Sequence, residues 1–150
     1  KENNYLFNEV SKVLTHKEDS NKILYILEPT RSKWGMKDQG EFQCLNYFIS
    51  SMNAMGLNSD WSIVLRPHPT EHSTKYDQWI AEVDYPHISS NSEQPLHEAI
   101  GTSKIIVGCE SYALTIAIHA NKEVYCAIPP WGPECKLPFK RLIHIRDLRS

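Results

Sequence analysis

The feature that most constrains the fold is an alternation between short apolar runs and longer segments with helical spacing of apolar residues. The apolar runs cover residues 23–27, 62–65, 104–108 and 123–128. Each run is nearly continuous rather than alternating, which is typical of strands buried on both faces of a parallel sheet. Right-handed crossovers between parallel strands place the intervening helices on both faces. The sequence therefore predicts an α/β fold.

Weaker signals complete this pattern. A short strand is expected near residues 87–90, and another apolar run lies at residues 142–145. Apolar residues at helical spacing predict helices over residues 42–55, 76–83, 94–100 and 112–119. We expect the first of these to end near Gly56, and Ser73 is the expected N-cap of the second. The predicted fold is a three-layer Rossmann-like sandwich with a parallel sheet of five to six strands.

The chain has 150 residues, about the size of one domain. Leu6, Val10 and Val13 fall at helical spacing, so we expect a helical lead-in over residues 1–20 and the Rossmann-like domain over residues 21–150. The net charge is −2, with both signs interspersed, which argues against a nucleic-acid partner. No apolar run approaches the ~18 residues of a membrane-spanning helix, so no transmembrane segment is expected.

The cysteines show no metal-binding or redox motif. They are Cys44, Cys109, Cys126 and Cys135. None forms a CxxC pair, and none has zinc spacing with a pair of histidines. We interpret them as small buried hydrophobic residues in a reducing compartment, and the spacing gives no support for disulfides although it does not exclude them.

The sharpest candidate for a functional site is the Arg-Pro-His-Pro sequence at residues 66–69, which we call the His-Pro loop. It directly follows an apolar run, and ligands of open α/β sheets bind at the carboxyl ends of strands. The two prolines stiffen the loop and favour extended backbone around Arg66 and His68. A guanidinium beside an imidazole suits phosphate. The alternative is a capped loop in which His68 bonds a backbone carbonyl.

A second candidate is Ser111, which follows the apolar run ending at Gly108 and stands where the next helix should start. The N-terminus of a helix presents free N–H groups and the positive end of its dipole, so it favours phosphate. The alternative is an ordinary serine N-cap, with Glu110 beside it favourable to the dipole. Arg66, His68 and Ser111 together are the predicted phosphate-binding residues.

Four further residues are candidates for contacts with a nucleoside or with neighbouring loops: Arg31, His97, Glu98 and Glu110. Arg31 belongs to a loop rich in cations and hydroxyls at residues 28–35. His97 and Glu98 lie on the short helix before the central strand, although both are also compatible with a solvent-facing position. The fingerprints of NAD-binding Rossmann domains, P-loop NTPases and α/β-hydrolases are all absent from the sequence.

The His-Pro loop, followed about 40 residues later by the segment at 108–114, resembles the C-terminal half of GT-B glycosyltransferases. It is most similar to the bacterial capsule and surface-polysaccharide group, which includes polysialyltransferase-like and Kdo-transferase-like enzymes and the CDP-glycerol glycerophosphotransferases. The resemblance covers roughly residues 21–145. It implies that His68 is catalytic and contacts the donor phosphate, and that Ser111 contacts the same phosphate from the helix end.

This resemblance implies a donor-binding domain for a CMP-, CDP- or UDP-linked sugar, with no cofactor besides that substrate. GT-B enzymes use two Rossmann-like domains, and this chain has the length of one. A glycan or lipid-linked acceptor would then bind to a preceding domain outside this chain. The expected location is the cytoplasm, at the inner face of the membrane if the parent protein is peripheral. No metal is expected, since protein cations could stabilise the leaving phosphate and no Asp-x-Asp motif is present.

Three alternatives remain open at this point. One is a UDP-sugar 2-epimerase-like domain, which shares the GT-B architecture. Another is a non-catalytic regulatory or assembly module that kept the fold and lost turnover. The weakest is a flavodoxin- or receiver-like domain, because the early acidic pair of a receiver is missing and Arg66 and His68 would have no role there.

Overall fold

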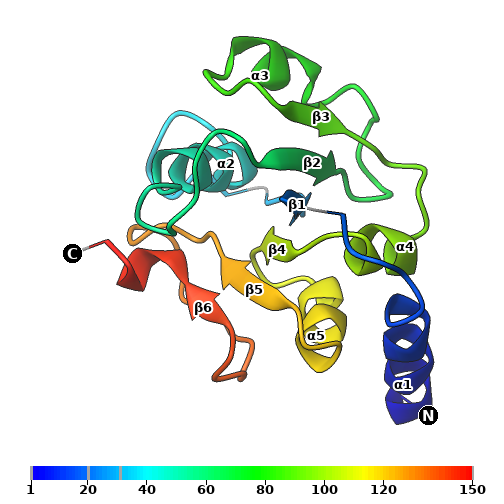
Figure 1. Ribbon diagram of the computed structural model, residues 1–150. Helices are drawn as coiled ribbons and strands as arrows, with labels where there is room; N and C mark the ends of the chain where they lie inside the picture. The colour runs from blue at the N-terminus through cyan, green and yellow to red at the C-terminus, as the bar shows by residue number, and fades with distance from the viewer. Residues whose placement is uncertain (1, 20, 31, 150) are drawn as a thin grey trace.

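The computed structural model describes residues 2–19, 21–30 and 32–149, and over this range the chain forms a three-layer α/β sandwich (Figure 1). The central sheet has six strands in the order β3-β2-β1-β4-β5-β6, and every neighbouring pair is parallel. The strands are β1 Lys22–Ile26, β2 Ser62–Arg66, β3 Ile88–Ser90, β4 Ile105–Gly108, β5 Glu123–Cys126 and β6 Ile143–His144. The predicted Rossmann-like sandwich with a parallel sheet is therefore confirmed.

Helices cover both faces of this sheet, as right-handed crossovers require. The helices are α1 Glu2–Val13, α2 Gly40–Ser50, α3 Asp77–Glu82, α4 Leu96–Gly101 and α5 Tyr112–His119, with a 3₁₀ turn at Ile145–Asp147. Helices α1, α4 and α5 pack together on one face (Figure 1). Helix α2 lies on the other face, where the Trp79 indole of α3 donates to Asn46 of α2 at 2.8 Å.

The strand order reverses between β1 and β4. Strand β1 pairs with β2 on one side and with β4 on the other, so the crossovers leave these two central strands in opposite directions. Loops diverging at such a point leave a crevice at the carboxyl edge of the sheet, which is where α/β folds bind ligands. The residues that follow β1, β2 and β4 are therefore the ones to inspect for a site.

Two local predictions need correction. Helix α2 ends at Ser50 rather than near residue 55, and the chain continues in tight turns to Gly56, whose φ of 76° favours glycine. Ser73 is not the N-cap of α3, because that helix begins at Asp77 and is preceded by Tyr76 with no side-chain cap. The apolar periodicity continued through both regions, and periodicity alone does not locate the end of a helix.

Helix α1 packs on the rest of the fold rather than extending from it. It contacts α4 and α5, and Val13 at its end is fully buried in the same core as the sheet. Gly101 at the end of α4 lies so close that a Cβ there would be 2.7 Å from the Val13 carbonyl oxygen. No helix in the described part of the chain is long and apolar enough to cross a membrane.

The core contains one buried polar group whose removal should increase stability. Among the residues that the structure describes, the Tyr25 hydroxyl has no hydrogen-bond partner although the side chain is buried. A buried hydroxyl without a partner costs about 1–3 kcal/mol, so Tyr25→Phe should raise the free energy of unfolding by about 1 kcal/mol. Urea denaturation measures this change.

Tyr76→Phe is the matched control for this substitution. The Tyr76 hydroxyl is also buried, but it donates to the Glu71 carboxylate at 2.6 Å. Losing a hydrogen bond to a charged group should lower the free energy of unfolding by about 2 kcal/mol. If the two substitutions changed stability in the same direction, the different environments assigned to these hydroxyls would be wrong.

Candidate functional site

A cavity of about 230 Å³ lies at the carboxyl edge of the sheet, where the ends of β1 and β2 meet the start of α5. It is lined by Tyr5, Ile26, Leu27, Arg66, Pro67, His68, Pro69, Leu96, Ser111, Tyr112, Ala113 and Ile116. The volume is below the ~300–1,000 Å³ of sites that enclose a drug-sized ligand. The cavity therefore suits a small anionic group such as phosphate, with the rest of a larger ligand outside.

Arg66, His68 and Ser111, which the sequence predicted as phosphate-binding residues, all line this one cavity. They come from two separate segments of the chain, one at the end of β2 and one after β4. Parallel strands bring their carboxyl ends to the same edge of a sheet, and here that edge is beside the reversal of strand order.

The His68 ring is held by the residue two positions along. Its Nδ1 accepts the backbone N–H of Thr70 at 3.2 Å and lies 2.7 Å from the Thr70 hydroxyl. Because Nδ1 accepts a backbone proton, the neutral ring carries its own proton on Nε2. Among the described residues nothing bonds Nε2, so the imidazole has an N–H donor for a ligand. The ring also caps its own loop, as the alternative expected, but through a backbone N–H rather than a carbonyl.

Glu71 anchors the His-Pro loop through hydrogen bonds of its carboxylate. One carboxylate oxygen accepts the backbone N–H of His68 at 2.9 Å, and the other accepts from Lys75 at 2.7 Å and from Tyr76 at 2.6 Å. Burial alone would raise the pKa of Glu71, but these hydrogen bonds outweigh it and lower that pKa. A buried, ionised carboxylate thus fixes the backbone that carries His68.

This anchor extends to the loop after β1. Lys75 also forms an ion pair with Glu41, and the other oxygen of Glu41 accepts the backbone N–H of Thr30 at 3.3 Å. The side chains of Glu41 and Glu71 are only 2% and 3% exposed. Burial would lower the pKa of Lys75, but the two carboxylates outweigh it and raise that pKa. The network joins the loops that follow β1 and β2.

Arg66 is half-buried at the cavity wall. One guanidinium nitrogen donates to the carbonyl of Gln94, which leads into α4. Burial lowers the pKa of Arg66, yet a guanidinium stays charged at neutral pH because its unperturbed pKa is so high. The bond to Gln94 fixes the head group, and its other N–H donors can reach an anion in the cavity.

Ser111 caps α5 at the opposite wall. Its hydroxyl oxygen accepts the backbone N–H of Ala113 at 3.1 Å, so the interpretation as an ordinary N-cap is correct. The same position places the first turn of α5 in the cavity wall. Tyr112 is exposed beside it, with its ring centroid 6.0 Å from that of Tyr5. These two rings form an aromatic rim from α5 and α1.

Three of the remaining candidates, His97, Glu98 and Glu110, do not line this cavity. The His97 ring faces the turn that follows α1, where its Nδ1 lies 3.0 Å from Nε2 of His16. Glu98 accepts from the Gln94 side chain at 2.8 Å. The Glu110 carboxylate accepts the backbone N–H of Lys136 at 2.8 Å. Arg31 lies outside the described residues. Contacts within the fold account for the three that are described.

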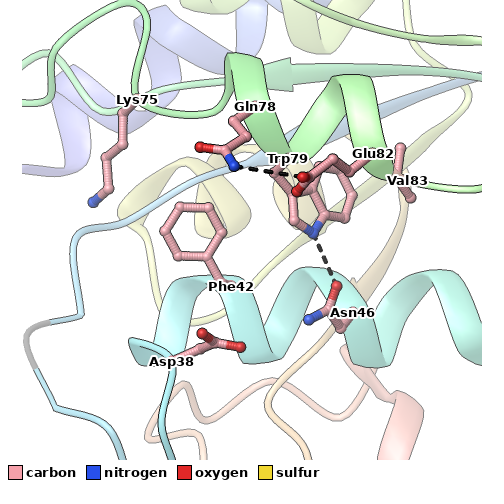
Figure 2. Close-up of a pocket in the computed structure, with 8 residues that line it drawn as sticks. All are labelled: Asp38, Phe42, Asn46, Lys75, Gln78, Trp79, Glu82 and Val83. Atoms are coloured by element: carbon pink, nitrogen blue, oxygen red, sulfur yellow. Dashed lines mark hydrogen bonds between the residues drawn. The ribbon is translucent and has the colours of Figure 1, made fainter.

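Two larger hollows lie along α2. One, of about 450 Å³, separates α2 from α3 and includes Phe42, Lys75 and Trp79 (Figure 2). Figure 2 shows the Gln78 amide directed at Glu82 and the Trp79 indole at Asn46, and both pairs are hydrogen-bonded. The other, of about 530 Å³, lies beside Trp131 and Arg149. Neither is lined by Arg66, His68 or Ser111, so the smaller cavity is the better candidate.

No protein-family model and no curated protein sequence matches this chain. Within the described residues, no group of three or more His, Cys, Asp or Glu side chains is placed to hold a metal ion. The candidate site therefore stands on the geometry of the cavity and on the residues that line it.

Proposed function

We propose that the cavity binds the phosphate of a nucleotide-activated sugar, and that the chain is the donor-binding half of a GT-B-like glycosyltransferase of surface-polysaccharide biosynthesis. The observation that carries the proposal is the convergence of Arg66, His68 and Ser111 on one cavity at the carboxyl edge of the sheet. A CMP-, CDP- or UDP-linked sugar fits a cavity that has room for phosphate and an open rim for the rest of the ligand.

In this proposal each residue has a separate role. The Nε2–H of His68 and the guanidinium of Arg66 bond the phosphate oxygens, and the first turn of α5 contributes its dipole. When the bond from the sugar to the phosphate breaks, negative charge grows on the departing nucleotide, and these fixed donors stabilise it. The group that deprotonates the acceptor would belong to a partner domain, in the cytoplasm or at the inner face of a membrane.

The test is a calorimetric titration of CMP, CDP, UDP and GDP into the chain, with His68→Ala and His72→Ala compared. His72 has the same local geometry, because its Nδ1 accepts from Thr74 at 3.2 Å, but it does not line the cavity. We expect one nucleotide to bind preferentially and His68→Ala to weaken it by about 10- to 100-fold, the equivalent of a charged hydrogen bond. His72→Ala should leave the affinity unchanged.

Two outcomes would count against the proposal. Equal affinities for the two histidine variants would mean that the nucleotide binds elsewhere. If no nucleotide binds at millimolar concentration, a non-catalytic module of this fold becomes the better account. An epimerase-like domain would bind UDP but give no transfer product when the parent protein is assayed.

A further inference from the structure

All four cysteines gather near the carboxyl ends of β4 and β5, although they are far apart in the sequence. Cys109 follows β4, Cys126 ends β5, Cys44 lies in α2, and Cys135 lies in the loop between β5 and β6. The Sγ atoms of Cys44 and Cys109 are 3.5 Å apart. The Sγ atoms of Cys126 and Cys135 are 3.4 Å and 3.3 Å from the same acceptor, the Cys109 carbonyl oxygen. All four thiols are free.

Access from solvent separates Cys109 and Cys135, which are both half-buried, from the other two thiols. Cys44 and Cys126 are both 1% exposed. Cys135 is half-buried and lines an open cavity of about 210 Å³ together with Glu134, His144, Arg146 and Asp147. A small reagent can therefore enter beside Cys135, whereas Cys126 is closed to solvent and does not line the cavity.

The two thiols that share the Cys109 carbonyl also affect each other. The neighbouring Cys126 side chain lowers the pKa of Cys135 to about 7, against the opposing effects of burial and of Glu110 and Glu28. The influence of Cys135 and burial raise the pKa of Cys126. Since the thiolate is the reactive form, Cys135 has both the access and the ionisation of an attacking thiol.

We propose that Cys126 and Cys135 form an oxidisable dithiol, in which Cys135 reacts first with a small-molecule disulfide and Cys126 resolves the product. The Cys135 thiolate attacks one sulfur of a disulfide such as oxidised glutathione, forming a mixed disulfide and releasing one glutathione thiolate. The Cys126 sulfur then attacks Cys135 Sγ, and its proton goes to the second departing glutathione. The two protein thiols lose two electrons and two protons, and one molecule of oxidised glutathione becomes two of glutathione.

The new bond would close a ring over the segment between β5 and β6. This segment contacts the body of the fold through the Lys136 N–H bond to Glu110 and through the Trp131 indole bond to Gln43. Glu110 directly precedes Ser111, the cap of α5. Oxidation would therefore fix the loop that borders the start of α5. The proposal does not depend on nucleotide binding and can hold if the proposed function fails.

The test is to expose the native chain to oxidised glutathione, trap remaining thiols by alkylation, and map the peptides by mass spectrometry. We expect a single cross-linked pair, Cys126 with Cys135, and alkylated Cys44 and Cys109. Several results would overturn the proposal: a Cys44–Cys109 cross-link as the main product, a glutathione adduct that persists on the native chain, or four unreacted thiols.

Variants separate the two roles. Cys126→Ser should accumulate the glutathione adduct on Cys135, because the resolving thiol is gone. Cys135→Ser should form neither adduct nor cross-link, and because Cys135 lies in a loop this variant is the one least disruptive to folding. The double variant Cys44→Ser/Cys109→Ser is the matched control and should still form the Cys126–Cys135 bond. Unchanged oxidation in Cys135→Ser, or its loss in the double variant, would contradict the assignment.

Discussion

Glu71→Ala is expected to lower the free energy of unfolding by about 3–5 kcal/mol, the cost of breaking a buried ion pair. The substitution removes the acceptor for the His68 N–H, the Lys75 ammonium and the Tyr76 hydroxyl. Lys75 keeps Glu41 as a partner, but the two buried donors beside it lose theirs. Urea denaturation of the variant and the native chain measures the difference.

Lowering the pH should destabilise the chain by protonating the same carboxylate. The pKa of Glu71 is lowered in the folded state, so its contribution to stability is present above the ordinary carboxyl pKa of 4.5 and is lost as the pH falls through the folded value. The native chain should therefore lose stability below about pH 4.5, and Glu71→Gln, which cannot ionise, should lose less over the same range.

The control for both measurements is Glu82→Ala. Glu82 is an exposed carboxylate at the end of α3, and within the described part of the chain its one bond is to the Gln78 amide at 3.4 Å. An exposed substitution of this kind should change stability by no more than about 0.5 kcal/mol. Hydrogen exchange gives a local readout, because the His68 N–H should exchange faster once its acceptor at residue 71 is gone. If Glu71→Ala cost no more than Glu82→Ala, Glu71 would not anchor the His-Pro loop.

The parallel sheet could be predicted because the sequences of its central strands are distinctive by themselves. The strands β1, β2 and β4 coincide with nearly continuous apolar runs, and only a strand covered on both faces tolerates such a run. The strand order was not predictable. After β3, which lies at one edge of the sheet, the chain crosses back and adds β4 on the free side of β1. No local sequence pattern encodes on which side of the sheet the next strand is added.

The same distinction applies to the site. Placing Arg66, His68 and Ser111 together required only that parallel strands end at one edge, so the sequence sufficed to predict the cavity wall. Glu71 and Lys75, four residues apart, resemble an ordinary surface pair in the sequence. Their burial depends on Glu41, which is 34 residues from Lys75 and whose approach is set by how α2 packs on the sheet.

The contacts between the cysteines and the neighbour of His97 could not be predicted, for a related reason. The spacing of the cysteines carries no motif, yet three segments bring them together, and the Cys44 and Cys109 thiols in contact are 65 residues apart. The His97 ring meets His16 in the turn that follows α1, and its contact with a nucleoside stays a prediction. Helical spacing predicts that α1 forms but not the surface on which it packs.

The contact between α1 and α4 is the basis of a second large expected change in stability. Gly101→Ala should lower the free energy of unfolding by about 3 kcal/mol, the upper part of the range for overpacked sites. A Cβ at this position would lie 2.6 Å from the Cβ of His16 and 2.7 Å from the Val13 carbonyl oxygen. The Val13 carbonyl belongs to the backbone and cannot change rotamer as a flexible side chain can, so α1 must move away from α4. The better helix propensity of alanine offsets only part of this cost.

Lys104→Ala, at an exposed position just beyond α4, is the control and should change stability by no more than about 0.5 kcal/mol. Hydrogen exchange in α1 should increase in Gly101→Ala and stay constant in the control. If the two variants were equally stable, α1 would not hold its close position on α4. Because Tyr5 lines the candidate cavity from α1, displacement of this helix should also weaken nucleotide binding, which connects the packing of α4 to the site.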